Sequence, residues 1–212
     1  MNSQSLVAPK RISRTERAAA RTSTREMLVR CGTEIFTERG FQATGIDEIR
    51  LRVNVPKGSF YHFFSSKHEF GLAVIDNYAA YFERKLARSF DDTQLMPLER
   101  ISAFANDAMR GMAKFNFQRG CLIGNLGQEL GGLNDEFRDK LEAVLQAWQS
   151  RTASCLSDAV RTGQLSVSAD CEALAEFFWI GWEGAILRAK LTRNNNPLER
   201  FLAHFMLTAR AA

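Results

Sequence analysis

The sequence predicts an all-α fold of about nine helices in two domains. Apolar residues recur at helical spacing, three and four positions apart, through most of the 212 residues. No segment alternates polar and apolar residues for long enough to indicate a sheet. Residues that start helices (Ser, Asp, Pro) and glycines that end them divide the chain into segments of helical length.

The N-terminal part is expected to hold a basic arm followed by a first helix. Residues 1–21 are rich in Ser, Ala and Arg without a strong period, which is typical of a flexible arm. The first helix should run from about Thr24 to Gly40, a residue that suits the position just after a helix. Cys31 and Ile35 share its apolar face, so Cys31 is assigned to the core.

A helix-turn-helix is expected next, at about residues 45–64. Thr44 offers an N-cap for a helix over Ile46–Val53, and Asn54 can adopt the left-handed conformation that a tight turn needs. Pro56 then opens the second helix at its first position, where its missing N–H costs nothing.

The rest of the chain is expected to form a helical domain. Ser65 and Ser66 cap a long helix that ends near Asp91. Further helices are expected over Pro97–Phe117, Gly120–Leu130, Asp135–Thr162, Asp170–Thr192 and Pro197–Arg210. The predicted organisation is therefore an arm (1–21), a three-helix domain (22–68) and a C-terminal domain (69–212).

The distribution of charge indicates a polyanionic partner. The chain carries a net charge of +4, but residues 1–68 hold twelve Lys or Arg against six Asp or Glu, so the remainder is slightly acidic. Such asymmetry is typical of a chain that binds nucleic acid, or an acidic membrane surface, at one end. The exposed side of the second helix of the helix-turn-helix favours DNA, because it offers hydrogen-bond donors and a glycine: Lys57, Gly58, Ser59, Tyr61 and His62.

Other features exclude several classes. No apolar run approaches the roughly 18 residues of a membrane span, and no apolar segment follows Lys10 and Arg11 as in a signal peptide, so we expect a cytoplasmic protein without membrane contact. The four cysteines form no C-x-x-C pair, which argues against zinc and disulfides; no metal or other cofactor is expected. No histidine lies near a cysteine in a catalytic pattern, so we expect no enzyme.

The helix-turn-helix residues resemble the TetR/AcrR family of regulators. The matching motifs are Phe36 with Gly40 and Phe41, Thr44 with Ile49, the run from Val55 to Phe63, and Ser66-Lys67. The resemblance implies that Thr44 and Lys67 contact DNA phosphates and that the outward residues from Lys57 to His62 face double-stranded operator DNA. Arg50 departs from the Ala-x-x-Ala-Gly run of many members, and we expect it outward as a further phosphate contact. For the arm, DNA contact and disorder without function both stay open.

The C-terminal half resembles the branch of this family that responds to electrophiles and acrylate-type acids, over residues 120–130 and 178–191. The resemblance implies a reactive Cys121 with Lys190 close to it in space. The sequence itself places Cys121 after Gly120 at a possible helix N-terminus, which would lower its thiol pKa. The alternative is that Cys121 is a small buried core residue.

Aromatic residues in the C-terminal half suggest a small-molecule pocket. Trp179 is assigned to a dimer core formed by helices near 135–162 and 170–192, as the resemblance implies. A carboxylate ligand would be countered by Arg151, Arg188 or Lys190. The expected ligand residues are Cys121, Asn125, Trp148, Trp182, Glu183 and Lys190.

The sequence features predict a DNA-binding protein, and the family resemblance implies a homodimeric repressor that a small electrophile or unsaturated acid releases from a palindromic operator. The alternative is a repressor with a reversible pocket for an unrelated apolar ligand and no cysteine sensing. A membrane-surface protein would leave the helix-turn-helix pattern unexplained.

Overall fold

The computed structural model describes the backbone from Arg14 to Ala212 and the side chains from Thr22 onward. This part of the chain is all-α, as predicted, and contains no strand. Its helices are α1 (Arg14–Arg39), α2 (Ile46–Arg52), α3 (Lys57–Phe63), α4 (Lys67–Phe90), α5 (Pro97–Lys114), α6 (Leu122–Leu130), α7 (Asp135–Arg161), α8 (Cys171–Thr192) and α9 (Asn196–Ala211).

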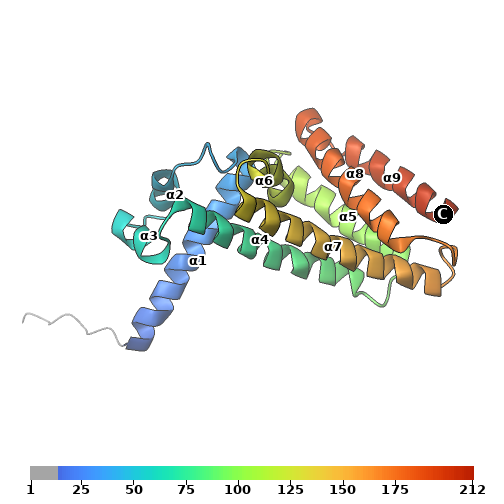
Figure 1. The fold of residues 1–212 in the computed structure, drawn as a ribbon, viewed down its shortest axis with the longest axis horizontal. Coiled ribbons are helices and arrows are strands. Elements are labelled where there is room, and N and C mark those ends of the chain that lie inside the picture. The colour runs from blue at the N-terminus through green and yellow to red at the C-terminus, as the bar shows by residue number, and fades with distance from the viewer. Residues whose placement is uncertain (1–13) are drawn as a thin grey trace, which may run out of the picture.

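The helices form an elongated molecule with a small three-helix unit at one end (Figure 1). Helices α1, α2 and α3 gather at that end, and α5, α7, α8 and α9 pack side by side toward the other. Helix α4 contacts both α1 and α7, and α6 contacts both as well. These two helices therefore connect the N-terminal unit to the C-terminal bundle.

Local chemistry explains the breaks between the first four helices. Gly40 ends α1 with a φ of +86°, and Asn54 has a φ of 53° in the turn between α2 and α3, as predicted for both. Ser66 caps α4, since its side chain accepts a hydrogen bond from the Glu69 N–H. The Glu69 carboxylate accepts in return from the Ser65 N–H at 2.7 Å.

Three predicted boundaries were wrong. Helix α1 begins at Arg14 rather than near Thr24, because Ala and Arg favour a helix even where no apolar period marks one. Residues 1–13 of the predicted arm lie outside the described residues. Helix α5 ends at Lys114 instead of Phe117, where left-handed conformations at Asn116 and Phe117 break it. Gly45, not Thr44, is the N-cap of α2.

Two aromatic clusters fill the core. In the N-terminal unit, the rings of Phe36, Phe60 and Phe64 surround Phe70 of α4, with ring centroids 4.9 to 5.8 Å away. Cys31 is buried beside them, as assigned, and its thiol donates to the Ile49 carbonyl. The second cluster lies in the bundle and consists of Phe82, Phe104, Trp148, Phe178, Trp179, Trp182, Phe201 and Phe205.

Candidate functional site

The outer face of α3 presents the polar residues that the sequence predicts. Lys57, Gly58, Tyr61 and His62 are exposed and Ser59 is half-buried, while Phe60 is fully buried against Phe70. An added Cβ on Gly58 would meet nothing within 4 Å, so a large ligand can approach the backbone there. This face can supply hydrogen-bond donors and one cation to a DNA groove.

The three expected phosphate contacts are less available than predicted. Thr44 is buried and its hydroxyl donates to the Gly40 carbonyl at 2.7 Å, so the hydroxyl is not free to bind a phosphate in this arrangement. Arg50 is turned onto its own helix, where its Nε donates to Asp47 at 2.6 Å, and this hydrogen bond holds the pKa of Asp47 below its usual value. The Lys67 Nζ donates to the Gln42 carbonyl at 3.3 Å.

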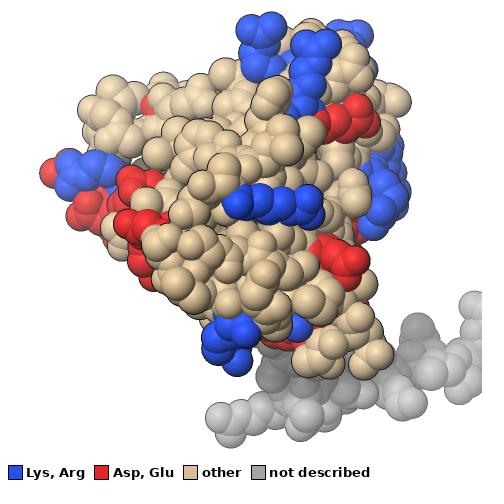
Figure 2. Space-filling view, turned by 90° about the vertical axis from the view of Figure 1, so that its right-hand side faces the viewer, with Lys and Arg blue, Asp and Glu red and all other residues tan. Residues whose placement is uncertain are grey.

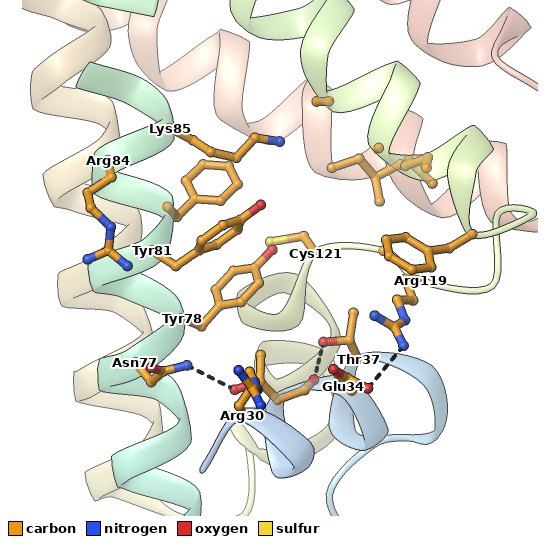
Figure 3. A pocket seen from close by; sticks show the side chains of 18 of the residues that line it. Arg30, Glu34, Thr37, Asn77, Tyr78, Tyr81, Arg84, Lys85, Arg119 and Cys121 are labelled. Atoms are coloured by element: carbon orange, nitrogen blue, oxygen red, sulfur yellow. Dashed lines mark hydrogen bonds and ion pairs between the residues drawn. The ribbon is translucent and has the colours of Figure 1, made fainter. Parts of the chain in front are cut away.

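A cavity of about 830 Å³ lies where the N-terminal unit meets the bundle. Its wall is formed by α1, α4, α5 and α8 and by the segment that leads from α5 into α6. Figure 3 shows Tyr78, Tyr81 and Cys121 facing the same space, with Arg119 on another side of it. Of the predicted ligand residues, Cys121 and Trp182 line this cavity. A volume of this size suits a small ligand.

The cavity wall carries charge that the sequence did not reveal. Arg119 lies between α1 and the bundle, where its guanidinium binds Glu38 at 2.7 Å and Glu34 at 3.4 Å. Lys85 of α4 pairs with Asp107 of α5 at 2.9 Å. The Arg119 pairs therefore join α1 of the N-terminal unit to the segment before α6, at the edge of the cavity.

Cys121 sits at the N-cap of α6, as its position after Gly120 predicts. The alternative that Cys121 is a small buried residue is confirmed, since its side chain is 4% exposed. The lowered pKa expected at a helix N-terminus was wrong, because burial raises the pKa of the thiol well above its usual value and the charge of Glu183 adds to the rise. The thiol makes no capping hydrogen bond at the start of α6. The N–H groups of Ile123 and Gly124 lower its pKa, but burial raises the pKa by more. Desolvation here outweighs the helix dipole.

The residues around Cys121 come from α6 and α8. Lys190 lies against Gly120, the residue before Cys121, with its Cδ 2.9 Å from the position of an added Cβ. Burial lowers the pKa of Lys190 and raises that of Glu183 to about 7. Asn125 does not line the cavity, because its side-chain amide donates to the Thr37 carbonyl of α1 at 3.1 Å.

Other predicted side chains lie away from the cavity. Trp148 is buried against Phe82, with ring centroids 4.1 Å apart, so its ligand role is not supported. Trp179 is buried within one subunit, where its Nε1 donates to Thr152 at 2.9 Å, and its assignment to a dimer core was wrong. The proposed counter-charge Arg151 pairs instead with Asp91 at 3.0 Å.

Sequence reasoning missed most of the cavity wall. Arg188 is exposed and absent from it, whereas the cations that line it come from α1, α4 and the segment before α6: Arg30, Arg84, Lys85 and Arg119. Tyr78 and Tyr81 of α4 also line it and were not among the expected ligand residues. The one local signal was Arg119, which directly precedes the Gly120-Cys121 pair.

Helix α6 holds the segment that follows α1. The Glu129 carboxylate accepts hydrogen bonds from the Phe41 N–H at 2.8 Å and from the Gln42 N–H at 2.6 Å. An added Cβ on Gly40 would lie 2.7 Å from the same carboxylate, so close contact requires glycine there. We call this pair of hydrogen bonds the Glu129 clamp. It ties the end of α6 to the chain that leads into α2.

The opposite end of the molecule has a different character. Figure 2 shows a mainly uncharged face on which single Lys, Arg, Asp and Glu side chains are scattered.

Within the described residues, no group of His, Cys, Asp and Glu side chains is arranged to hold a metal ion. None of the helices from Arg14 onward has the length and apolarity needed to cross a membrane.

Family models match both parts of the chain. The model described as "Bacterial regulatory proteins, tetR family" matches residues 28–74, and "Tetracyclin repressor-like, C-terminal domain" matches residues 97–205. The chain is 52% identical to the transcriptional regulator AcuR of Cereibacter sphaeroides, over 85% of this chain and 82% of that protein. It is 34% identical to the HTH-type transcriptional repressor DhaR of a Mycobacterium species, over 86% and 90%.

Solved structures share the same fold. A regulatory protein TetR from Rhodobacter sphaeroides matches with a TM-score of 0.83 and 51% identity, covering 86% of this chain and 96% of that one. The reduced form of NemR from Escherichia coli matches with a TM-score of 0.77 and 29% identity, covering 86% and 95%.

Proposed function

The chain belongs to the tetR family of bacterial regulatory proteins, DNA-binding transcriptional regulators rather than enzymes, and on this basis we propose how it binds DNA and what releases it. In this proposal the chain forms a homodimeric repressor that binds operator DNA in the cytoplasm. A small molecule in the cavity between the N-terminal unit and the bundle releases it.

DNA reading is assigned to the exposed face of α3. Lys57, Tyr61 and His62 would enter the major groove from two subunits, so the operator would be palindromic with half-sites about one helical turn apart. Lys57→Ala is expected to weaken operator binding and to reduce the salt dependence by about one phosphate contact. Fluorescence anisotropy at two salt concentrations measures both, and Lys140→Ala on α7 is the control. An unchanged salt dependence for Lys57→Ala would argue against this assignment.

Dimerisation is assigned to α8 and α9. The outer face of α8 carries apolar residues and one glycine at alternating spacings of three and four, the pattern of a helix-packing seam: Phe177, Ile180, Gly184, Leu187 and Leu191. Ile180 and Leu191 of α8 are 68% and 71% exposed and Leu207 of α9 is 66% exposed, so large aliphatic side chains gather on one uncovered face. The seam therefore supports a dimer interface formed by α8 and α9, rather than by the expected helices near 135–162 and 170–192.

One observation carries the effector role: the cavity wall includes α1 of the DNA-binding unit as well as α4, α5 and α8. A ligand that fits only one arrangement of these helices shifts the balance between arrangements that bind and release the operator. We assign the effector to small electrophiles or unsaturated acids, with Cys121 in the cavity wall as the sensing thiol. This assignment draws on the resemblance at residues 120–130.

The test is operator binding with and without acrylate and a thiol-reactive electrophile, for the wild type and Cys121→Ser. Release of the wild type but not of Cys121→Ser supports thiol sensing. Equal release of both would contradict it and leave a reversible pocket. If neither reagent releases the protein from operator DNA, the proposed effector class is contradicted.

The second candidate is a reversible pocket without cysteine sensing. It is favoured by the raised pKa of Cys121, because the protonated thiol is a weak nucleophile. The cationic wall residues Arg30 and Lys85 suit a carboxylate ligand in either case. Calorimetric titration with the Cys121→Ser variant measures such binding directly.

A further inference from the structure

Three polar side chains from distant parts of the chain gather around the first turn of α6: Tyr78 of α4 and Cys121, which line the cavity, and Glu183 of α8, which lies against Gly124. The Tyr78 hydroxyl points toward the Cys121 sulfur (Figure 3). Burial raises the pKa of Tyr78 well above its usual value, and the neighbouring Cys121 adds to the rise. The Glu183 carboxylate lies against Gly124, three residues after Cys121 on the same helix turn, and burial together with the charge of Glu183 raises the pKa of Cys121.

Glu183 is an unusual group to find at this place. One of its carboxylate oxygens, Oε1, is buried and has no hydrogen-bond partner among the described residues. The other, Oε2, lies against Gly124, where only glycine leaves room for it. An unsatisfied buried acceptor is costly and calls for a functional explanation. Burial also raises the pKa of Glu183 to about 7, close to the value that suits a general base at neutral pH.

We propose that Glu183 is the general base that activates Cys121 for addition to α,β-unsaturated carbonyl compounds that enter the cavity. This inference rests on the proposed sensor role of Cys121. It removes the difficulty that a buried thiol is unreactive, because a carboxylate beside the sulfur takes the proton only as the reaction proceeds. Glu183 would also supply the base for Cys121, a role for which the sequence places no histidine near a cysteine.

The reaction balances without an oxidant or reductant. Glu183 takes the proton from the Cys121 thiol, and a sulfur electron pair forms a C–S bond to the β-carbon of the alkene. The C=C π electrons move onto the α-carbon and its carbonyl, and the α-carbon then takes the proton back from Glu183. The product is a thioether on Cys121, and the carboxylate is regenerated. Tyr78 and the N–H groups of Ile123 and Gly124 stabilise the transient thiolate.

The experiment measures the rate at which acrylamide, a small neutral unsaturated amide, labels Cys121 in the full chain. Mass spectrometry of digested samples follows Cys121 and, as an internal control in the same protein, the half-buried Cys171. For Glu183→Gln, we expect the Cys121 rate at pH 7 to fall by about a hundredfold while the Cys171 rate stays unchanged. A carboxylate that acts only through its charge predicts the opposite, because its removal lowers the thiol pKa and speeds labelling. An unchanged or faster rate therefore overturns the proposal.

The wild type supplies a second test that needs no variant. The groups that face Glu183 are Cys121 from α6 and Tyr78 from α4, with Lys190 further along α8 against Gly120. A general base predicts a labelling rate that rises to about pH 7 and then levels off. A rate that keeps rising past pH 9, as for an unassisted buried thiol, overturns the proposal.

The outcomes also separate this proposal from the proposed function. Labelling of wild-type Cys121 that does not depend on Glu183 removes the general base and leaves the sensor thiol. A wild-type Cys121 that acrylamide does not label removes the sensor thiol and this inference with it. Operator binding, measured separately, decides the repressor role in either case.

Discussion

Replacing Glu129 by Gln tests whether α6 controls the position of the DNA-binding unit. The carboxylate accepts two backbone N–H groups, at 2.8 and 2.6 Å, whereas a Gln amide offers one oxygen and turns its NH₂ toward the second donor. A hydrogen bond to a charged group contributes about 1.5–3 kcal/mol, and partial exposure of the clamp reduces this to roughly 1–2 kcal/mol. We expect the free energy of unfolding to fall by that amount, which lowers Tm by about 2–8 °C.

Urea denaturation followed by tryptophan fluorescence measures this change. The matched control is Glu142→Gln on the exposed face of α7, where the carboxylate accepts only from Gln146, and its effect should stay within about 0.5 kcal/mol. We also expect Glu129→Gln to bind operator about 5–30 times more weakly, because the released loop no longer presents α2 and α3 in one orientation. If Glu129→Gln matches the control in both measurements, the clamp does not hold the loop and the reasoning fails.

Three further changes test the seam, the packing and the buried acid. Ile180→Glu should convert the dimer to monomer in sedimentation velocity at micromolar concentration, whereas the equally exposed Leu133→Glu should not; a dimeric Ile180→Glu would exclude the seam. Gly124→Ala places a Cβ against the Glu183 carboxylate and should cost about 1–3 kcal/mol of stability, while Gly127→Ala, whose Cβ meets nothing, should gain up to about 1 kcal/mol; equal effects would contradict the packing. Because the raised pKa of Glu183 favours its protonated form in the folded state, wild-type stability should fall between about pH 4.5 and 7, by at most about 3 kcal/mol, and Glu183→Gln should flatten that fall.

The helices and the DNA-reading face were predictable because their signals are local. Gly40 and Asn54 adopt the left-handed conformations expected from their residue types, and Ser66 caps α4 as expected. Lys57 and Tyr61 are exposed because the apolar residues between and around them must face the core. Such features depend on neighbours within one or two helical turns, which the sequence displays directly.

The cavity and its chemistry depend on contacts between distant segments. The sequence left two possibilities for Cys121, a helix N-terminus with a lowered thiol pKa and a buried core position, and burial decides between them by raising the pKa. Nothing in the sequence shows that Glu183, sixty-two positions away, lies against the same turn of α6. Thr44 looked like an N-cap by type, yet its hydroxyl binds Gly40, and Gly45 takes the cap position. A helix can be predicted without its neighbours, whereas a pocket cannot.

Helix α4 has a mechanical consequence that follows from its length. Its 24 residues form one unbroken rod of about 36 Å, with the cavity-lining residue Tyr78 at its middle, Lys85 in its second half and the N-terminal unit packed on its first turns. A tilt of about 5° pivoting near the far end moves the beginning of the rod by about 3 Å. That displacement equals the length of a hydrogen bond. A small ligand can therefore move the N-terminal unit out of register with a DNA groove without unfolding any helix. Because α4 is stiff, a small tilt caused beside the cavity grows along the helix and breaks contacts at the operator.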